Sequence, residues 1–324
     1  MCGPSIIDEA TRETIAAFSS APGEVSQSPF GPDDEIGMIN LLTPTVAREQ
    51  LARADGGKVF DLSVDLFMGM PTWTAAGEPP FSIWMVHTPQ GSVVDDPVGV
   101  GAAQNETVAW SADAISMFTH CGTHIDTLNH FGYRNKIWNG FDADDHLGSR
   151  HWTKAGADSL PPVISRGVLI DVAAAKGVQV LPDGYAIGES DLVEALQRQG
   201  TELSVGDVVM VRTGRGSTWP DADAYLPQEP GLDRAGAEFL AKSGAAMVGA
   251  DNVALEHLPS RDPENWLPVH TYLLAEAGVP IMEVVDLEEV SQDEVYEFVF
   301  VGACLKLRGA TAGPIRPLAL PIRR

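Results

Sequence analysis

The chain has 324 residues, of which 44% are hydrophobic and 20% charged, a composition typical of a globular protein large enough to enclose an active site. Its 45 acidic residues outnumber 21 basic ones and give a net charge of −24, which argues against partners such as nucleic acids and anionic membranes. No stretch approaches the ~20 apolar residues of a membrane helix. The three cysteines, Cys2, Cys121 and Cys304, are too sparse for a disulfide framework, so we expect a cytoplasmic protein.

The N-terminal part favours helix and irregular structure. Residues 5–19 predict a short amphipathic helix, and the Pro, Gly, Ser and Asp residues of 20–35 predict an irregular segment. Thr43-Pro44 predicts a helix start, with Thr as the cap and Pro in the first turn, and Gly56-Gly57 predicts its end.

The rest of the chain alternates between short apolar runs of strand length and helical patterns. The expected strands are residues 58–67, 81–87, 166–172, 207–213, 246–251 and 295–307. The expected helices are residues 190–199, capped by Ser190, residues 232–242 and residues 266–277, each followed by a glycine. This order predicts an α+β fold with a mixed sheet and helices on one side. We expect residues 1–57 to form an N-terminal helical arm and residues 58–324 to form a single domain.

Three of the eight histidines fall within eleven residues, and an aspartate lies among them. His120, His124, Asp126 and His130 share one parity, so on an extended strand all four side chains point to one side. Neighbouring β-branched residues and Gly122 disfavour a helix, which leaves a strand or turn facing one cavity. Imidazoles and carboxylates that converge in this way are metal ligands. The alternative is a set of polar residues that hydrogen-bond on a sheet face.

The segment His120–Phe131 resembles H-x-G-T-H-x-D-x-x-x-H-F, the signature of the cyclase family of metal-dependent hydrolases, which includes bacterial kynurenine formamidase and isatin hydrolase. Residues 31–40 resemble a segment of the longer members. Further similarity lies in residues 61–63, 70–73, 166–172, 206–209 and 309–317. The resemblance implies a swivelling β/β/α domain with a mixed sheet.

The resemblance also implies roles for individual residues. His120, His124 and Asp126 would ligate a metal ion, and His270 and Glu283 are the candidate ligands of a second one. The His and carboxylate ligands suit zinc or manganese, and the number of ions, one or two, stays open.

Three more residues are candidates for the site. His130 matches the proton-transfer residue of the family, and Trp73 matches an aromatic residue that lines the substrate pocket. Asp251 ends a predicted strand, where it could support the ligands from behind or merely start a turn.

The expected activity is hydrolysis of a small molecule, and the expected substrates are cyclic amides, imides, lactones or aryl formamides with a planar ring. A metal-dependent cyclase or dehydratase of a biosynthetic pathway is one alternative, and a non-catalytic binding protein on the same fold is another. The resemblance further implies a homodimer or homotetramer.

Overall fold

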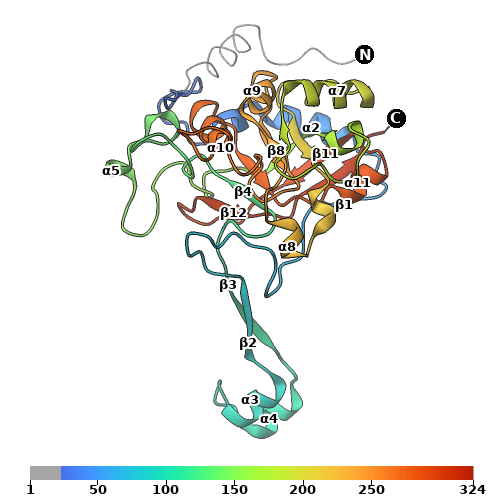
Figure 1. Ribbon diagram of the computed structural model, residues 1–324. Helices are drawn as coiled ribbons and strands as arrows, with labels where there is room; N and C mark the ends of the chain where they lie inside the picture. The colour runs from blue at the N-terminus through green and yellow to red at the C-terminus, as the bar shows by residue number, and fades with distance from the viewer. Residues whose placement is uncertain (1–22, 324) are drawn as a thin grey trace.

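The computed structural model describes residues 23–323, so the helix expected at residues 5–19 lies outside the described part. The architecture is a mixed α/β fold, built on a nine-stranded sheet that curls into a half-barrel (Figure 1). The strand order is β1-β13-β11-β5-β7-β9-β10-β4-β12. The strands are β1 (Phe60–Asp61), β4 (His124–Asp126), β5 (Val163–Asp171), β7 (Val208–Arg212), β9 (Met247–Ala250), β10 (Ile281–Glu283), β11 (Glu297–Gly302), β12 (Ala312–Pro314) and β13 (Leu318–Pro321).

The centre of the sheet is parallel, and its flanks are antiparallel. Strands β5, β7, β9 and β10 pair in parallel, whereas β4 pairs antiparallel with both β10 and β12. Every residue of β7 and β9 is buried, as expected for parallel strands covered on both faces. Two apolar cores result, because Val168 and Ile170 face one side of the sheet while Leu169 faces the other.

Most of the longer helices cover one of these two faces. Leu192, Leu240 and Leu273 pack in the same core as Val168 and come from three different helices. The longer helices are α2 (Pro44–Arg53), α7 (Glu189–Gln199), α9 (Arg234–Lys242) and α10 (Pro268–His270), which continues as the π-helix η4 (Thr271–Glu276). The shorter helices are η1 (Gly37–Leu41), α5 (Ala143–His146), η2 (Trp138–Gly140), α6 (Val172–Ala175), η3 (Arg215–Thr218), α8 (Ala222–Tyr225) and α11 (Glu288–Gln292).

Several element boundaries differ from the sequence prediction. Only Phe60–Asp61 of the strand expected at 58–67 joins the sheet, because Ser63 already bridges Val285 instead. Residue 232 belongs to a short strand pair, β6 (Ala186–Ile187) with β8 (Gly231–Leu232), and α9 starts two residues later. The cap position of α7 is Gly188 rather than the predicted Ser190, because an aspartate side chain in the first turn accepts the Gly188 N–H.

Residues 27–40 are tied to the body by two carboxylates. Asp34 accepts a hydrogen bond from the indole nitrogen of Trp138 at 3.0 Å. Glu35 accepts from Lys154 Nζ and from the backbone N–H of Ala155, both at 2.9 Å. This segment, part of the expected N-terminal arm, therefore packs directly on the domain that carries the sheet.

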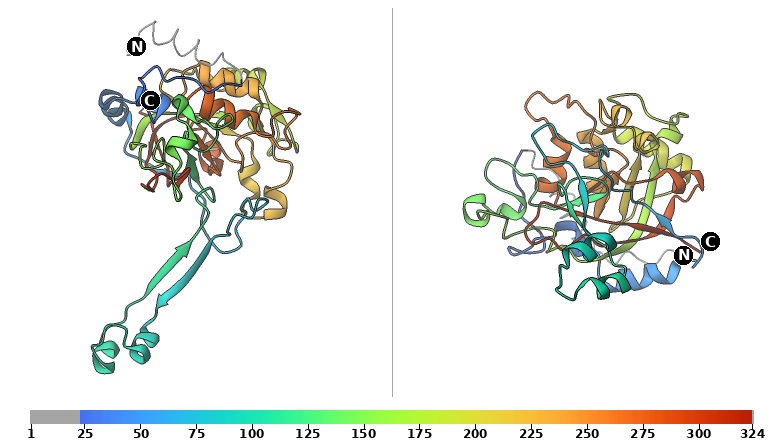
Figure 2. Two further views of the ribbon diagram at one scale, coloured as in Figure 1. Left: turned by 90° about the vertical axis from the view of Figure 1, so that its left-hand side faces the viewer. Right: turned by 90° about the horizontal axis from the view of Figure 1, so that it is seen from below.

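One part of the chain leaves the body altogether. Strands β2 (Ser82–His87) and β3 (Ala112–Ser116) form a two-stranded antiparallel ribbon, with α3 (Pro89–Asp95) and α4 (Ala102–Thr107) at its tip. Figures 1 and 2 show that this β2–β3 extension, residues 82–116, projects far from the rest of the molecule. Within residues 23–323, no helix is long and apolar enough to cross a membrane.

Candidate metal centre

The site is built on two adjacent short strands, β4 and β10. Their antiparallel register places His124 opposite Glu283 and Asp126 opposite Ile281, so these side chains emerge on the same face. That face is the helix-covered one, because Ile281 belongs to the core under the helices. The His124 Nε2 atom consequently lies 3.2 Å from Glu283 Oε2 and 3.3 Å from Asp126 Oδ1.

Two further imidazoles reach Asp126 from turns rather than from a continuous strand. The Nδ1 atom of His120 lies 2.7 Å from Asp126 Oδ1, and its Nε2 lies 2.9 Å from the hydroxyl of Thr311. His130 brings its Nε2 to 3.7 Å from Asp126 Oδ2. The rings of His120 and His130 are 4.0 Å apart. The chain thus converges on Asp126 from both directions.

His270 completes the cluster from the helical layer. It ends α10, and its Nε2 lies 3.1 Å from Glu283 Oε1 and 3.7 Å from Asp126 Oδ2. Its other ring nitrogen lies 2.8 Å from Glu256 Oε1. The ligand atoms form two groups, one of His120, Asp126 and His130 and one of His124, Asp126 and Glu283, each within 4.8 Å. Asp126 is common to both.

Several atoms of the cluster are suited to a cation. Among the described residues, His124 Nε2, both carboxylate oxygens of Asp126 and Glu283 Oε1 are buried without a hydrogen-bond partner. Buried polar atoms are normally paired, and an unpaired one costs free energy that a bound ion would recover. The Nδ1 of His124 lies 2.8 Å from the Gly122 carbonyl, an arrangement that leaves the Nε2 lone pair free for a metal. The donor set therefore fits a divalent ion.

The pKa values of the cluster residues also favour a bound cation. Burial opposes the charged form of His124, but the carboxylates of Asp126 and Glu283 outweigh it and raise its pKa to about 10. Burial likewise opposes the charge on His270, whose pKa Glu256 and Glu283 raise well above its usual value. The pKa of Asp126 lies well below its usual value, because the surrounding imidazoles overcome its burial. The cluster thus attracts positive charge at its centre.

His130 behaves differently. Burial, reinforced by the three neighbouring imidazoles and opposed by Asp126, holds its pKa well below the usual value. Its side chain is also the most exposed of the four, at 22% against 8% for His120, 1% for His124 and 4% for His270. His130 is therefore a neutral imidazole at the open side of the cluster.

Two candidates, Trp73 and Asp251, lie in loops outside the two strands that carry the cluster. Trp73 lies in the loop before the β2–β3 extension and is 37% exposed. Asp251 accepts hydrogen bonds from the backbone N–H groups of Thr213 and Gly214, both at 2.8 Å, in the loop after β7. Burial raises the pKa of Asp251 to about 6. The hydrogen bonds of its carboxylate within the described residues hold this loop rather than the ligand cluster.

Sequence reasoning missed two residues that hold ligands in place. Glu256 is buried and accepts from the backbone N–H of Val269 and of His270 as well as from the His270 ring, so it both caps α10 and orients its imidazole. Thr311 contacts the His120 ring. Both lie far from the histidine motif in sequence. The only local signal was that Glu256 is an acid in an apolar run.

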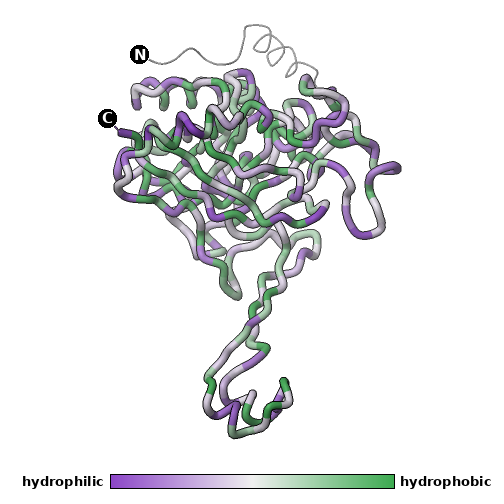
Figure 3. The backbone as a smooth tube through the Cα atoms, turned by 180° about the vertical axis from the view of Figure 1, so that it is seen from behind, coloured by the Kyte–Doolittle hydropathy of each residue, from purple (hydrophilic) through white to green (hydrophobic). Residues whose placement is uncertain are grey.

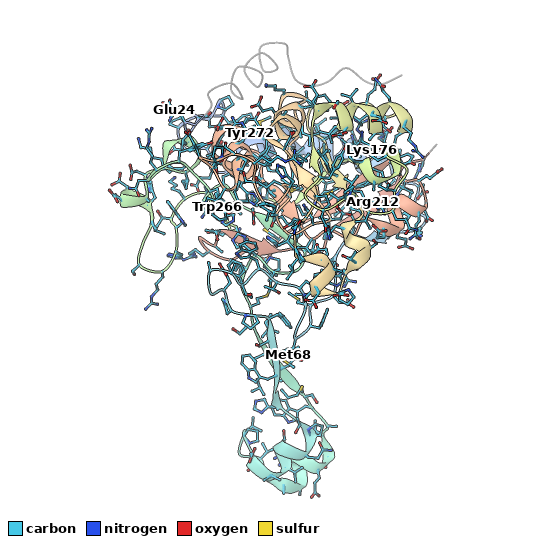
Figure 4. All side chains as sticks on the ribbon, in the orientation of Figure 1. Glu24, Met68, Lys176, Arg212, Trp266 and Tyr272 are labelled. Carbon is cyan, nitrogen blue, oxygen red and sulfur yellow. The ribbon has the colours of Figure 1, made fainter. Side chains whose placement is uncertain are left out.

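An aromatic surface flanks the open side of the cluster. The Phe131 ring lies 4.6 Å from His130 and 5.1 Å from His270. Trp266 lies 5.8 Å from Phe131 and is 64% exposed. Figure 4 shows Trp266 on the body, above the root of the β2–β3 extension. A flat ligand next to His130 would contact these rings.

Comparisons with known proteins agree with this arrangement. Residues 60–257 match the family model described as "Putative cyclase". A crystal structure of a novel cyclase is 30% identical, with a TM-score of 0.79, over 90% of this chain and 95% of that chain. Isatin hydrolase A from Ralstonia solanacearum superposes with a TM-score of 0.63 at 22% identity, over 86% of this chain and 98% of that chain.

A curated enzyme is also similar along most of its length. Kynurenine formamidase of Bacillus thuringiensis (strain Al Hakam) is 25% identical over 267 residues, which are 81% of this chain and 97% of that enzyme. The family match includes the histidine motif and Glu256, and the similarity to the novel cyclase extends over 90% of the chain. The chain belongs to the cyclase family and has the fold of its metal-dependent hydrolases.

Proposed function

We propose that this protein is a metal-dependent hydrolase that opens a cyclic amide, imide or lactone, or cleaves an aryl formamide. The observation that carries the proposal is the position of Asp126, whose buried carboxylate oxygens have no hydrogen-bond partner among the described residues and which belongs to both groups of ligand atoms. A carboxylate shared in this way is suited to bridging two ions.

The proposed ligands are His120, His124, Asp126, His270 and Glu283. A divalent ion in this cluster, zinc or manganese, would acidify a water molecule and polarise a carbonyl group. The supporting residues act on the ligands themselves: the Gly122 carbonyl orients His124, and Glu256 orients His270. Such supporting contacts fix the ring that faces the metal.

His130 is the proposed proton-transfer residue. Its lowered pKa keeps the imidazole neutral near pH 7, so the ring can accept a proton at Nε2, which faces the cluster. The same ring can then donate that proton to the leaving nitrogen or oxygen of the substrate. Its greater exposure than the other three imidazoles supports direct contact with a substrate.

The proposed substrate carries a planar ring. Phe131 and Trp266 offer flat surfaces beside His130, on which such a ring would stack. The similar proteins named kynurenine formamidase and isatin hydrolase act on small molecules with aromatic rings, which supports the same class here. Trp73 is the further candidate for contact with the ring.

A metal-dependent cyclase or dehydratase would use the same ligands without consuming water. Assays in ¹⁸O-labelled water distinguish the two, because hydrolysis places one labelled oxygen in the carboxylate product and dehydration places none. A binding protein would turn over no substrate. The neutral, accessible His130 favours the hydrolase.

The test is an assay of metal-loaded protein on isatin, N-formylkynurenine, cyclic imides and lactones. We expect hydrolysis of at least one class, loss of it in His124→Ala, and unchanged activity in the control His151→Ala, which alters an exposed histidine. Full activity of His124→Ala, or of protein stripped with a chelator, would contradict the proposal.

A further inference from the structure

The ring of Phe131 flanks the open side of the metal centre, but the backbone that carries it makes few contacts. The ring is half-buried and lies 4.6 Å from His130 and 5.1 Å from His270. Within residues 23–323, neither Phe131 nor Gly132 makes a backbone–backbone hydrogen bond. Backbone without such bonds moves easily unless its neighbours fix it. The position of the ring therefore depends on what holds the residues on either side.

His130, on one side, is held independently of Phe131. Its N–H donates to the Thr127 carbonyl at 3.0 Å, and its ring lies 4.0 Å from the ring of His120. A change on the far side of Phe131 should therefore leave the proton-transfer residue and the metal ligands in place.

Tyr133, on the other side, reaches the helical layer. Its hydroxyl donates to Glu276 Oε1 at 2.6 Å. Burial and the Glu276 carboxylate raise the pKa of Tyr133, so the hydroxyl stays protonated and can donate. Directly after Tyr133 the chain turns back on itself, because the N–H groups of Tyr133 and Lys136 donate to each other's carbonyls at 3.0 and 3.1 Å. Tyr133 thus anchors the end of the segment that carries Phe131.

The acceptor of this bond is itself rigid. Glu276 is fully buried, and Arg234 of α9 donates to both of its oxygens, at 2.9 and 2.7 Å. Arg234 also lies over the Tyr272 ring, 4.5 Å from its centroid, and donates to Glu238 at 3.0 Å. A buried carboxylate with a bidentate partner has little freedom to move. Glu276 ends the π-helix η4, which begins directly after the proposed ligand His270, and π-helical turns are frequent at functional sites.

We propose that Tyr133 is a positioning residue for the substrate: its hydrogen bond to Glu276 holds Phe131 where the ring of the substrate stacks. The inference rests on the proposed hydrolase function and adds to it a residue that sets the affinity for an aromatic ring. Tyr133 acts on the KM of substrates with such a ring, because Phe131 contacts the ring. It leaves kcat unchanged, because His130 and the metal ligands are held by other contacts.

The test is the steady-state kinetics of metal-loaded Tyr133→Phe, which removes only the hydroxyl, on pairs of substrates that differ in an aromatic ring. Phthalimide with succinimide, phthalide with γ-butyrolactone, and formanilide with N-cyclohexylformamide are such pairs. The KM of the aromatic member should rise about 3–10-fold, the effect of losing one aromatic contact. Its kcat, the KM of the saturated member and the metal content should equal those of wild type. An unchanged KM, or an equal rise for both members, would overturn the proposal.

A double-mutant cycle tests whether Tyr133 acts through Phe131. In the background Phe131→Leu, the change Tyr133→Phe should cause no further rise in the KM of the aromatic member. If the two rises multiply instead, Tyr133 acts elsewhere and the proposal fails. Tyr185→Phe is the matched control, because it removes a hydroxyl that donates to the Asp191 carboxylate of α7 at 3.0 Å, and it should leave KM unchanged.

Trypsin provides a measurement that does not depend on turnover. Hydrophilic stretches lie along the outside of the body, as Figure 3 shows, and the exposed residues Arg134, Asn135 and Lys136 form one of them. Without its anchor this turn should open more often, so Tyr133→Phe should be cut after Arg134 and Lys136 roughly tenfold faster than wild type and Tyr185→Phe. If wild type hydrolyses none of the compounds, the proposed function fails and the cleavage rate alone decides the role of Tyr133. Equal cleavage of wild type and Tyr133→Phe would overturn that role.

Discussion

Glu256 tests whether the cluster is an organised metal centre, because it touches no proposed ion and acts only through His270. The substitution Glu256→Gln keeps the size of the side chain and removes its charge. In the native protein the carboxylate accepts three N–H groups, at 2.8 Å from the His270 ring, at 3.0 Å from the His270 backbone and at 3.3 Å from Val269. The carbonyl oxygen of a glutamine can accept the two hydrogen bonds from the ring and the backbone of His270, but its NH₂ group then faces the N–H of Val269.

The expected effect has two parts. Losing a charged acceptor that orients a ligand weakens metal binding by about 10–100-fold, equivalent to roughly 1.4–2.7 kcal/mol. The buried donor left facing the Val269 N–H costs about 1–3 kcal/mol of folding stability, independently of metal. The metal Kd should therefore rise even under conditions where the variant is fully folded.

The assay is competition with a fluorescent chelator for zinc and for manganese, which yields a metal Kd for each protein. Glu264→Gln is the matched control, because it makes the same change at an exposed position in the same loop. A Kd for Glu256→Gln equal to that of wild type and of the control would refute the reasoning that His270 is a ligand held by Glu256.

His130→Gln should retain metal content close to that of wild type while kcat falls by about 10²–10⁴-fold, the usual contribution of general acid–base catalysis; parallel loss of metal would instead make His130 a ligand. Burial raises the pKa of Glu229 to about 8. The folded protein therefore keeps a proton that the unfolded chain releases near pH 4.5. The free energy of unfolding consequently falls as the pH rises from about 5 to about 8. Glu229→Gln should remove that loss. Its free energy of unfolding, measured in urea at pH 9, should exceed that of wild type by at least about 1 kcal/mol, and the difference should shrink towards pH 5. Gly37 has φ +55°, and a Cβ there would lie 2.1 Å from the Gly278 carbonyl oxygen, so Gly37→Ala should lose about 2–4 kcal/mol of unfolding free energy. Gly56→Ala is its control, because that glycine has φ +75° but no atom within 4 Å of the added carbon.

The sequence predicted best where local pattern and burial coincide. The apolar runs at 207–213 and 246–251 are the parallel strands β7 and β9, whose residues face apolar groups on both sides and so need no alternation. Thr43-Pro44 starts α2 as expected, because Thr43 accepts the Val46 N–H and Pro44 has no N–H to satisfy. The histidine motif was visible because its members lie within eleven residues of one another.

The sequence predicted least where contacts with distant segments decide whether a residue joins the sheet or the ligand cluster. The run 58–67 has the composition of a strand, but only two of its residues find a partner, in β13. Glu256 and Thr311 join the cluster only when the sheet brings their segments to His270 and His120. The extension has the apolar content of a buried strand, and no local signal tells that it projects from the body.

The central claim is that Asp126 holds a metal ion at the centre of the cluster. Asp126→Asn keeps the shape of the side chain but removes the charge that both ligand groups share. Elemental analysis of desalted protein, with Asp223→Asn as an exposed control, measures the bound metal directly. The account predicts that wild type and the control retain a stoichiometric divalent ion and that Asp126→Asn loses it. Equal metal content in Asp126→Asn and wild type would contradict the account.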